Sequence, residues 1–218
     1  MLQTLPNLIN FEKFVDWLPE TSGMRYELHN GSIVKMAQPV GEHEEVKGFL
    51  NVEISFEIKR LGLPYAIPNQ ALIRPNGKDS GYFPDVLVVN RANLKNEKLW
   101  KKESILSDGV SIPLVIEVVS TNWRDDYHLK FADYEEMGIL EYWIVDYAAL
   151  GRRSFIGNPK QPTILVGNLV DGEYQISKFR DGDRLISQTF SELNLTPKQI
   201  FQAGLNSSPQ LYTNPSPQ

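Results

Sequence analysis

Apolar residues recur at helical spacing in three segments of the chain, 10–18, 42–61 and 125–137. The longest segment predicts a helix with one apolar side, formed by Val46, Phe49, Leu50, Ile54, Ile58 and Leu61. Gly62 and Gly138 follow the second and third segments, and glycine commonly ends a helix at this position. The pattern therefore predicts three helices, with a long one in the middle.

Dense apolar runs predict strands covered on both faces, at 85–90, 113–120 and 141–146. Segment 24–36 predicts two short strands joined at Asn30-Gly31, because Asn-Gly is the strongest short hairpin signal. Residues 65–74 predict a further strand that Pro68 interrupts. Strands and helices thus alternate through the first two thirds of the chain.

The rest of the chain predicts smaller elements. Residues 94–109 are polar and predict a loop or a short helix, while 154–186 predict antiparallel β ribbons turning at Asn158-Pro159 and Asp171-Gly172. Thr196-Pro197 has the cap and first-turn residues of a final short helix.

This order of elements predicts an α/β fold with a mixed sheet, helices on its faces and β hairpins added near the C-terminal end. A chain of 218 residues, 41% of them hydrophobic, is long enough for one domain and short for two. We therefore expect a single domain over 1–204. Residues 205–218 are rich in Ser, Pro, Asn and Gln and predict a flexible tail.

The amino-acid composition limits the kinds of catalytic and metal site that the chain can form. The chain has no Cys, which excludes disulfides, thiolate zinc sites and cysteine nucleophiles. Three His residues, at 29, 43 and 128, argue against a histidine-rich metal site. Carboxylate and carbonyl oxygens remain as metal ligands, and these suit Mg²⁺, Mn²⁺ or Ca²⁺.

Charge and hydropathy bear on partners and location. Residues 1–11 lack the basic and apolar pattern of a secretion signal, and no apolar segment approaches the length of a membrane span. We expect a cytoplasmic protein without a membrane partner. The net charge of −5 gives no general attraction to nucleic acid, so DNA binding would need local basic clusters or metal ions.

Two acidic residues stand at predicted core strands. Asp85 begins one apolar run, where it could be an ordinary turn aspartate. Glu117 lies inside the next, where an ionised carboxylate needs a metal, a proton or a buried Arg or Lys partner. Two carboxylates on consecutive core strands favour a site for a hard cation.

The ordered motifs of the chain resemble a known nuclease family. Pro84-Asp85, the acid of the following strand and a lysine on a helix resemble the PD-(D/E)XK nuclease superfamily. The wider series is similar to the bacterial Uma-type family of restriction endonucleases. It consists of Arg25–Gly31, Glu42-His43, Pro84–Val86, Ile116–Ser120, Asp126, Lys130, Tyr134 and Glu141–Asp146.

The lysine departs from the superfamily pattern, which places it two residues after the second acid, where this chain has Val119. The resembling family has its lysine on the next helix, matching Lys130. Tyr127, Phe131 and Tyr134 should face the sheet, with Lys130 about 60° around the helix. Its long stem could bring the ammonium to the strand end. The alternative is a surface pair with Asp126.

The resemblance adds two candidate residues. Glu27 would be solvent-facing by strand alternation with Tyr26 and Leu28, but the resemblance implies that it lies near the metal. His43 begins the long helix, either as an ordinary exposed residue or as one that contacts a phosphate or transfers a proton.

The resemblance implies a restriction endonuclease-like fold and a metal-dependent endonuclease that hydrolyses DNA. Mg²⁺, or Mn²⁺ in its place, would be held by Asp85, Glu117, the Val118 carbonyl and Glu27, directly or through water. Lys130 would orient the attacking water or stabilise developing negative charge. Double-strand cleavage by one small active site would ordinarily need two copies, which suggests a homodimer.

Two other functions fit the same residues. One is a nucleic-acid-binding or regulatory module that keeps the nuclease fold without cutting, favoured by the negative net charge and the uncharged Val119. The other is a structural protein whose acids pair with arginines such as Arg124 or Arg152.

Overall fold

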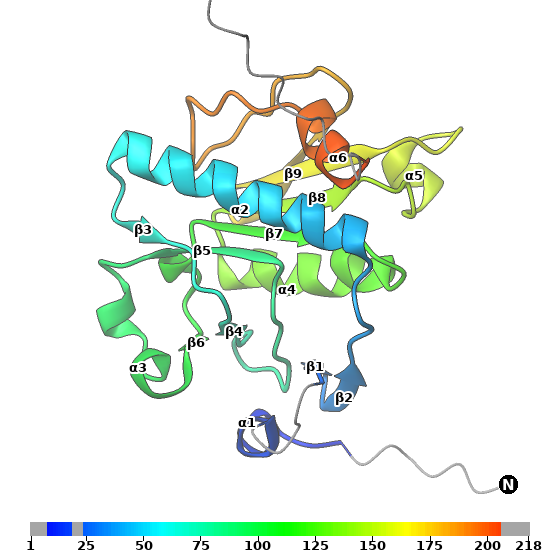
Figure 1. Ribbon diagram of the computed structural model, residues 1–218. Coiled ribbons are helices and arrows are strands. Elements are labelled where there is room, and N and C mark those ends of the chain that lie inside the picture. Colours follow the sequence, from blue (N-terminus) through cyan, green and yellow to red (C-terminus); the bar gives the residue numbers. More distant parts are fainter. Residues whose placement is uncertain (1–7, 19–23, 206–218) are drawn as a thin grey trace, which may run out of the picture.

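The computed structural model describes residues 8–18 and 24–205 (Figure 1). The tail predicted over 205–218 lies outside the described residues, except that Leu205 ends the last helix. None of the helices in this part of the chain has the length and apolar character needed to cross a membrane.

A six-stranded sheet forms the centre of the molecule, in the order β10-β9-β8-β7-β5-β3. Neighbours are antiparallel except β7 and β8, which are parallel, so the sheet is mixed as predicted. Its strands are β3 (Tyr65–Ala66), β5 (Val86–Asn90), β7 (Leu114–Val118), β8 (Glu141–Asp146), β9 (Thr163–Val170) and β10 (Glu173–Phe179). The apolar runs predicted as strands are β5, β7 and β8, and every residue of β7 and β8 is buried.

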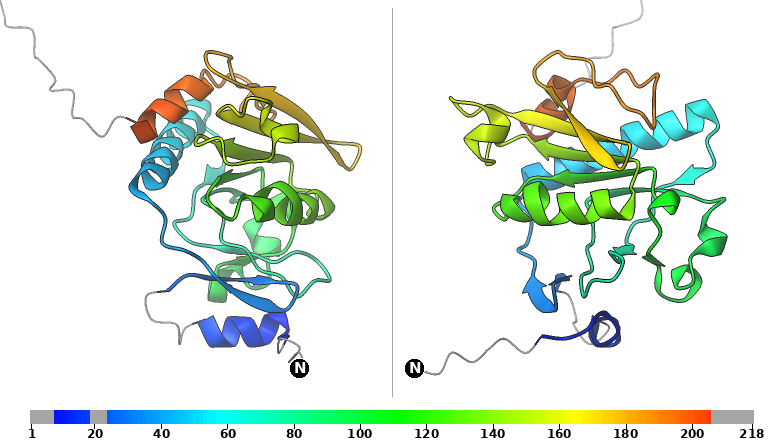
Figure 2. Two further views of the ribbon diagram at one scale, coloured as in Figure 1. Left: turned by 90° about the vertical axis from the view of Figure 1, so that its right-hand side faces the viewer. Right: turned by 180° about the vertical axis from the view of Figure 1, so that it is seen from behind.

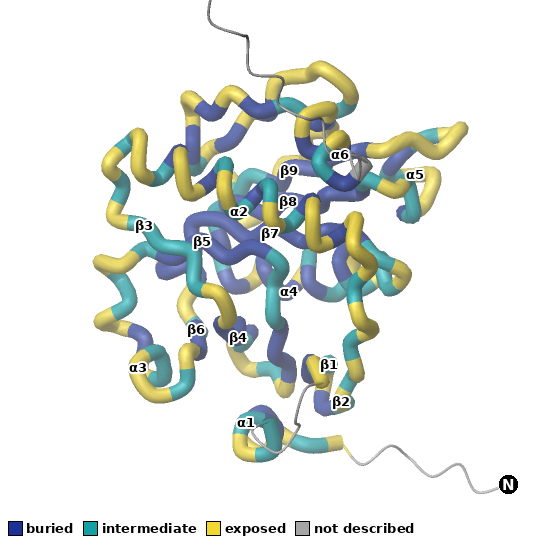
Figure 3. Tube along the Cα trace, viewed as in Figure 1, coloured by how far each residue is buried: buried dark blue, intermediate teal, exposed yellow. Residues whose placement is uncertain are grey.

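Helices cover both faces of this sheet (Figures 1 and 2). On one face, Val46, Leu50 and Ile54 of α2 (Gly41–Leu61) pack on alternate residues of the central strands. The last helix, α6 (Pro197–Leu205), packs against α2. On the other face, Tyr134 and Met137 of α4 (Lys130–Met137) join a second core. Strand alternation thus divides the interior into two layers, one on each face of the sheet. The central strands β7 and β8 are buried throughout (Figure 3).

A smaller group of elements, drawn from three separate parts of the chain, lies below the sheet in Figure 1. It contains α1 (Phe11–Trp17), the hairpin of β1 (Tyr26–His29) and β2 (Ser32–Lys35), and the parallel pair of β4 (Leu72–Ile73) and β6 (Ile105–Leu106). Leu28 bridges to Gly81 and has its own small core with Phe11 and Phe14. This bridge fixes the hairpin beside the segment that leads into β5.

The remaining elements confirm some expectations and correct others. Segment 94–109 was predicted to form a loop or a short helix, and it contains short helices. These are η2 (Leu94–Asn96), α3 (Trp100–Glu103) and the start of η3 (Gly109–Ser111). The interruption predicted at Pro68 is present, but it divides segment 65–74 into two short strands of different sheets, β3 and β4. Pro68 cannot donate to a ladder, and the chain leaves the main sheet there to form β4 elsewhere.

The C-terminal ribbon is shorter than predicted. Asp171-Gly172 makes the expected turn between β9 and β10, but a β turn at Asn158-Pro159 is wrong, because α5 (Arg153–Ile156) precedes it and β9 begins only at Thr163. After Phe179 the chain runs without strands to α6. Buried Glu141 holds this loop by accepting hydrogen bonds from Ser187 Oγ at 2.9 Å and Thr189 N at 2.7 Å.

Candidate active site

Asp85 and Glu117 lie opposite one another at one end of the central sheet. Val86 of β5 pairs with Ile116 of antiparallel β7, so the residues one step further along face each other across the ladder. Asp85 Oδ2 accepts a hydrogen bond of 2.9 Å from the backbone N–H of Val118. This contact ties the first carboxylate to the strand that carries the second.

Lys130, the first residue of α4, extends its side chain to the same end of the central sheet. Its Nζ lies 3.1 Å from Glu117 Oε1, 3.2 Å from Glu27 Oε1 and 3.5 Å from Asp126 Oδ1. The side chain is only 2% exposed, so the alternative of a surface pair with Asp126 is wrong, although the two side chains are close. One ammonium is thus shared by three buried carboxylates.

A π-helical turn places Lys130 there. η4 (Asp125–Leu129) is a π-helix that continues directly into α4. A π turn holds more residues than an α turn, so an offset of about 60° calculated for regular helix does not hold across it. Asp126 and Lys130 both point into the interior as a result.

The structure places Glu27 inside the cluster, so the solvent-facing interpretation is wrong. Oε1 accepts a hydrogen bond of 3.0 Å from the Phe83 backbone N–H, and Oε2 lies 2.9 Å from His29 Nε2. Strand alternation failed because the bridge between Leu28 and Gly81 brings the Phe83 N–H to Glu27, and Lys130 lies against the same side chain, so this side of β1 is not exposed as in a free hairpin.

His43 is also buried, so the exposed interpretation is wrong for this residue. Its Nε2 lies 2.9 Å from the Val118 carbonyl oxygen and 3.3 Å from Asp85 Oδ2. A carbonyl only accepts, so Nε2 carries the hydrogen in this contact. Burial lowers the pKa of His43, but the hydrogen bond and charge of Asp85 outweigh it, and the pKa is raised.

The cluster has more carboxylates than cations. Burial, together with the charges of Asp126, Asp85 and Glu27, raises the pKa of Glu117 well above its usual value despite the opposing effect of Lys130. Burial similarly raises the pKa of Asp126 to about 7. Attraction to these acids outweighs burial at Lys130 and raises its pKa, so the amine stays charged.

A buried Arg or Lys partner was the alternative to a metal ion for the two strand acids. Glu117 does pair with a buried lysine, Lys130, but within the described residues no arginine pairs with Glu117 or Asp85. Arg124 instead lies over the ring of Trp123, 4.6 Å from its centroid. The three carboxylates around Lys130 therefore share one lysine, and the remaining negative charge must be balanced by protons or by a metal ion.

Asp126 should make the metal-free protein lose stability as pH rises. Its raised pKa means that the folded state binds this proton more tightly than the unfolded chain, so the stabilisation is complete below pH 3.8 and is lost through about pH 7. Melting temperature in EDTA should fall less steeply over this range in Asp126→Asn than in wild type. Asp125→Asn is the matched control, and an identical slope in wild type and Asp126→Asn would contradict the assignment.

A cavity of about 160 Å³ opens onto these groups. Asp85, Glu117, Val118, Asp126, Lys130 and His43 all line it. Among the described residues, no three or more His, Asp or Glu side chains form a ready-made metal site. The oxygen donors nevertheless fit a hard cation. Lys130 and Tyr134 both contact Oε1 of Glu117, which leaves Oε2 able to bind a metal ion. The Val118 carbonyl oxygen has two lone pairs, so it can bind an ion while it accepts a hydrogen bond.

The sequence placed Tyr134 and Asp146 in the motif series that resembles the family, but it gave neither residue a role in supporting the cluster. The Tyr134 hydroxyl donates to Glu117 Oε1 at 3.1 Å. Asp146, at the end of β8, accepts from Tyr127 OH at 3.0 Å and from Gly151 N at 2.7 Å, which fixes the π-helical turn against the sheet. The spacing of Asp126 and Lys130 by four residues was the available signal for a third acid beside the lysine.

The mixed sheet, the helix on each face and the acidic end of the central strands define a protein of the restriction-endonuclease-like class. The chain belongs to the Uma2 family, whose sequence model is described as "Putative restriction endonuclease" and matches residues 11–198. This confirms the family resemblance seen in the motifs. Families of this class generally use divalent metal ions.

A solved structure has the same fold. It is the crystal structure of a putative nuclease belonging to DUF820 from Anabaena variabilis ATCC 29413, with a TM-score of 0.68 and 18% sequence identity. The similarity covers 90% of this chain and 99% of that one. No curated protein matches the chain.

Proposed function

We propose that the protein is a metal-dependent endonuclease that hydrolyses phosphodiester bonds in DNA. The observation that carries this proposal is the excess of buried carboxylates where Asp85 faces Glu117, beside the ammonium of Lys130. Buried carboxylates without enough cations are costly unless a metal or protons balance them. Membership of the Uma2 family supports the same reaction class.

Asp85, Glu117 and the Val118 carbonyl would hold the ion, with Mg²⁺ as the favoured cation and Mn²⁺ as a substitute. Both oxygens of Glu27 already have donors, from Lys130, Phe83 and His29, so this acid would act through water or by holding Lys130. When bound, the cation would polarise the scissile phosphate and lower the pKa of a water molecule.

The residues of the chain supply the remaining chemistry. Hydrolysis joins a water oxygen to phosphorus while the bond to the leaving oxygen breaks, and negative charge grows on the phosphate oxygens. Lys130 keeps its proton, because its pKa is raised, and so would stabilise this charge rather than act as a base. His43, held between Asp85 and the Val118 carbonyl, would keep both oxygens oriented.

The catalytically silent binding module remains the second candidate, supported by the net charge of −5. The uncharged Val119 supports it less, since Lys130 lies 3.1 Å from Glu117 and can replace a lysine on the strand. Cleavage of both DNA strands would call for two copies of the active site, which fits a homodimer.

Metal removal tests the proposal. Supercoiled plasmid incubated with the full-length protein and Mg²⁺ or Mn²⁺ should become nicked or linear, and EDTA should abolish the reaction because the carboxylates alone cannot activate water. Gel electrophoresis measures both. Plasmid that is bound but stays intact with every divalent cation tried would select the binding module instead.

A further inference from the structure

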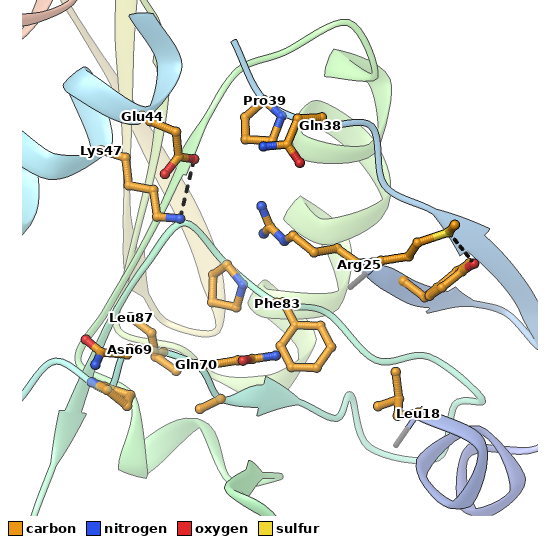
Figure 4. Close-up of a pocket in the computed structure, with 15 residues that line it drawn as sticks. Leu18, Arg25, Gln38, Pro39, Glu44, Lys47, Asn69, Gln70, Phe83 and Leu87 are labelled. Carbon is orange, nitrogen blue, oxygen red and sulfur yellow. Dashed lines mark hydrogen bonds and ion pairs between the residues drawn. The ribbon is translucent and has the colours of Figure 1, made fainter. Parts of the chain in front are cut away.

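A larger cavity adjoins the candidate active site (Figure 4). Its volume is about 610 Å³, within the range of roughly 300–1,000 Å³ that is typical of small-molecule sites. Four residues line both cavities, namely Arg25, Gln38, Pro39 and Phe83. A ligand in the larger cavity would therefore lie directly beside Asp85 and Glu117.

Two cationic side chains, Lys47 and Arg25, line the larger cavity together with Glu44. Lys47 descends from α2 into the larger cavity, and its Nζ lies 3.7 Å from Glu44 Oε1 and 4.0 Å from Asp85 Oδ1 (Figure 4). Arg25 extends from the base of the hairpin toward Gln38 and Pro39. Within the described residues its guanidinium pairs with no carboxylate, so it is available to an anion. A phosphate between these two cations would border the active-site carboxylates.

The rest of the larger cavity has the groups that bind nucleobases. Asn69 and Gln70 are exposed, and neither side-chain amide is hydrogen-bonded within the described part of the chain. Such amides offer both a donor and an acceptor to a base edge. Phe83 is half-buried beside them and presents an aromatic ring, on which any base can stack.

The overall charge favours a nucleotide held in a cavity over a long duplex contact. Duplex binding depends on many phosphate contacts with a basic surface, and this chain has a net charge of −5. A paired base inside a duplex cannot enter a pocket unless it leaves the stack, which costs energy, whereas an unpaired base enters freely. The geometry therefore suits single-stranded DNA.

We propose that the larger cavity binds one unpaired nucleotide next to the scissile phosphate, with Arg25 and Lys47 on its phosphate and Gln70 and Phe83 at its base. This inference rests on the proposed nuclease function, because it names the form of DNA that the site accepts. The protein would then bind and cut single-stranded DNA in preference to fully paired DNA.

Fluorescence anisotropy with a fluorescein-labelled oligonucleotide in EDTA tests the proposal without requiring cleavage. The single strand should bind about tenfold more tightly than the same sequence in a duplex. Arg25→Gln and Gln70→Ala should each remove most of this preference. Arg91→Gln is the matched control, since it makes the same change at an exposed arginine outside both cavities and should keep the preference.

The outcomes separate this inference from the nuclease proposal. Equal affinity for the two forms, or equal losses in Arg25→Gln and Arg91→Gln, would overturn the nucleotide cavity even if plasmid is cut. A strand preference that depends on Arg25 and Gln70, without cleavage by any divalent cation, would support the cavity while the nuclease proposal fails.

Discussion

Replacing Glu117 with glutamine is expected to lower metal-dependent DNA cleavage by about 100-fold or more while the fold stays intact. Loss of a residue that only supports a metal ligand costs about 10–100-fold, so loss of a ligand should cost at least the upper figure. The glutamine oxygen can still accept from Lys130 and Tyr134, the two present partners of Glu117. Removing one charge from crowded carboxylates also relieves repulsion.

Initial rates of plasmid nicking measure the first effect, and the melting temperature in EDTA measures the second. The melting temperature of Glu117→Gln should equal or exceed that of wild type. Glu45→Gln is the matched control, because Glu45 is exposed on the same molecule and lines neither cavity. A marked drop in melting temperature would instead show that Glu117 serves mainly as a structural partner of Lys130.

Replacing Lys130 with methionine is expected to destabilise the metal-free protein by about 3–5 kcal/mol near pH 8. Methionine fills much of the same space but leaves Glu27, Glu117 and Asp126 without the ammonium that lies within 3.5 Å of each. Loss of one partner of a buried ion pair strands the remaining charges in a medium that solvates them poorly.

Urea unfolding at about pH 5 and about pH 8 measures this loss. The loss should be smaller at the lower pH, where the carboxylates can take up protons and no longer need the lysine. Lys95→Met, at an exposed position, should have little effect at either pH. A Lys130→Met variant as stable as wild type near pH 8 would contradict the shared-ammonium cluster.

The central strands could be predicted because their apolar runs have only one stable location in an α/β fold. β7 and β8 are buried along their whole length, and runs such as 114–118 fit nowhere else. Asp85 lies opposite Glu117 because β5 and β7 are antiparallel neighbours in the sheet. Local pattern and global structure agree here, so the prediction needed no long-range information.

Other parts of the site depended on contacts between distant segments. Glu27 is buried because Leu28 bridges to Gly81, which is far from it in sequence and has no signal in the hairpin itself. His43 is buried because the start of α2 lies against Val118. The π-helical turn that directs Lys130 inward depends on packing against Asp146 through Tyr127, which residue periodicity does not reveal.

The hairpin of β1 and β2 lies outside the main sheet but contributes residues to the site at its end. β1 supplies Glu27, and the residue before β1 is Arg25, which lines both cavities. The Phe83 backbone N–H holds Glu27 while the Phe83 ring faces the larger cavity. The hairpin and the segment before β5 therefore join the proposed metal site to the proposed nucleotide cavity as one structural unit.

Crystals grown with Mn²⁺ offer the most direct test of a metal site between the two strand carboxylates. Anomalous scattering should show one ion whose oxygen ligands come from Asp85, Glu117 and Val118, at the distances of about 2.0–2.6 Å usual for hard cations. Lys130 should remain beside Glu117 without touching the ion. No bound Mn²⁺, or an ion bound away from both carboxylates, would contradict the metal-dependent mechanism.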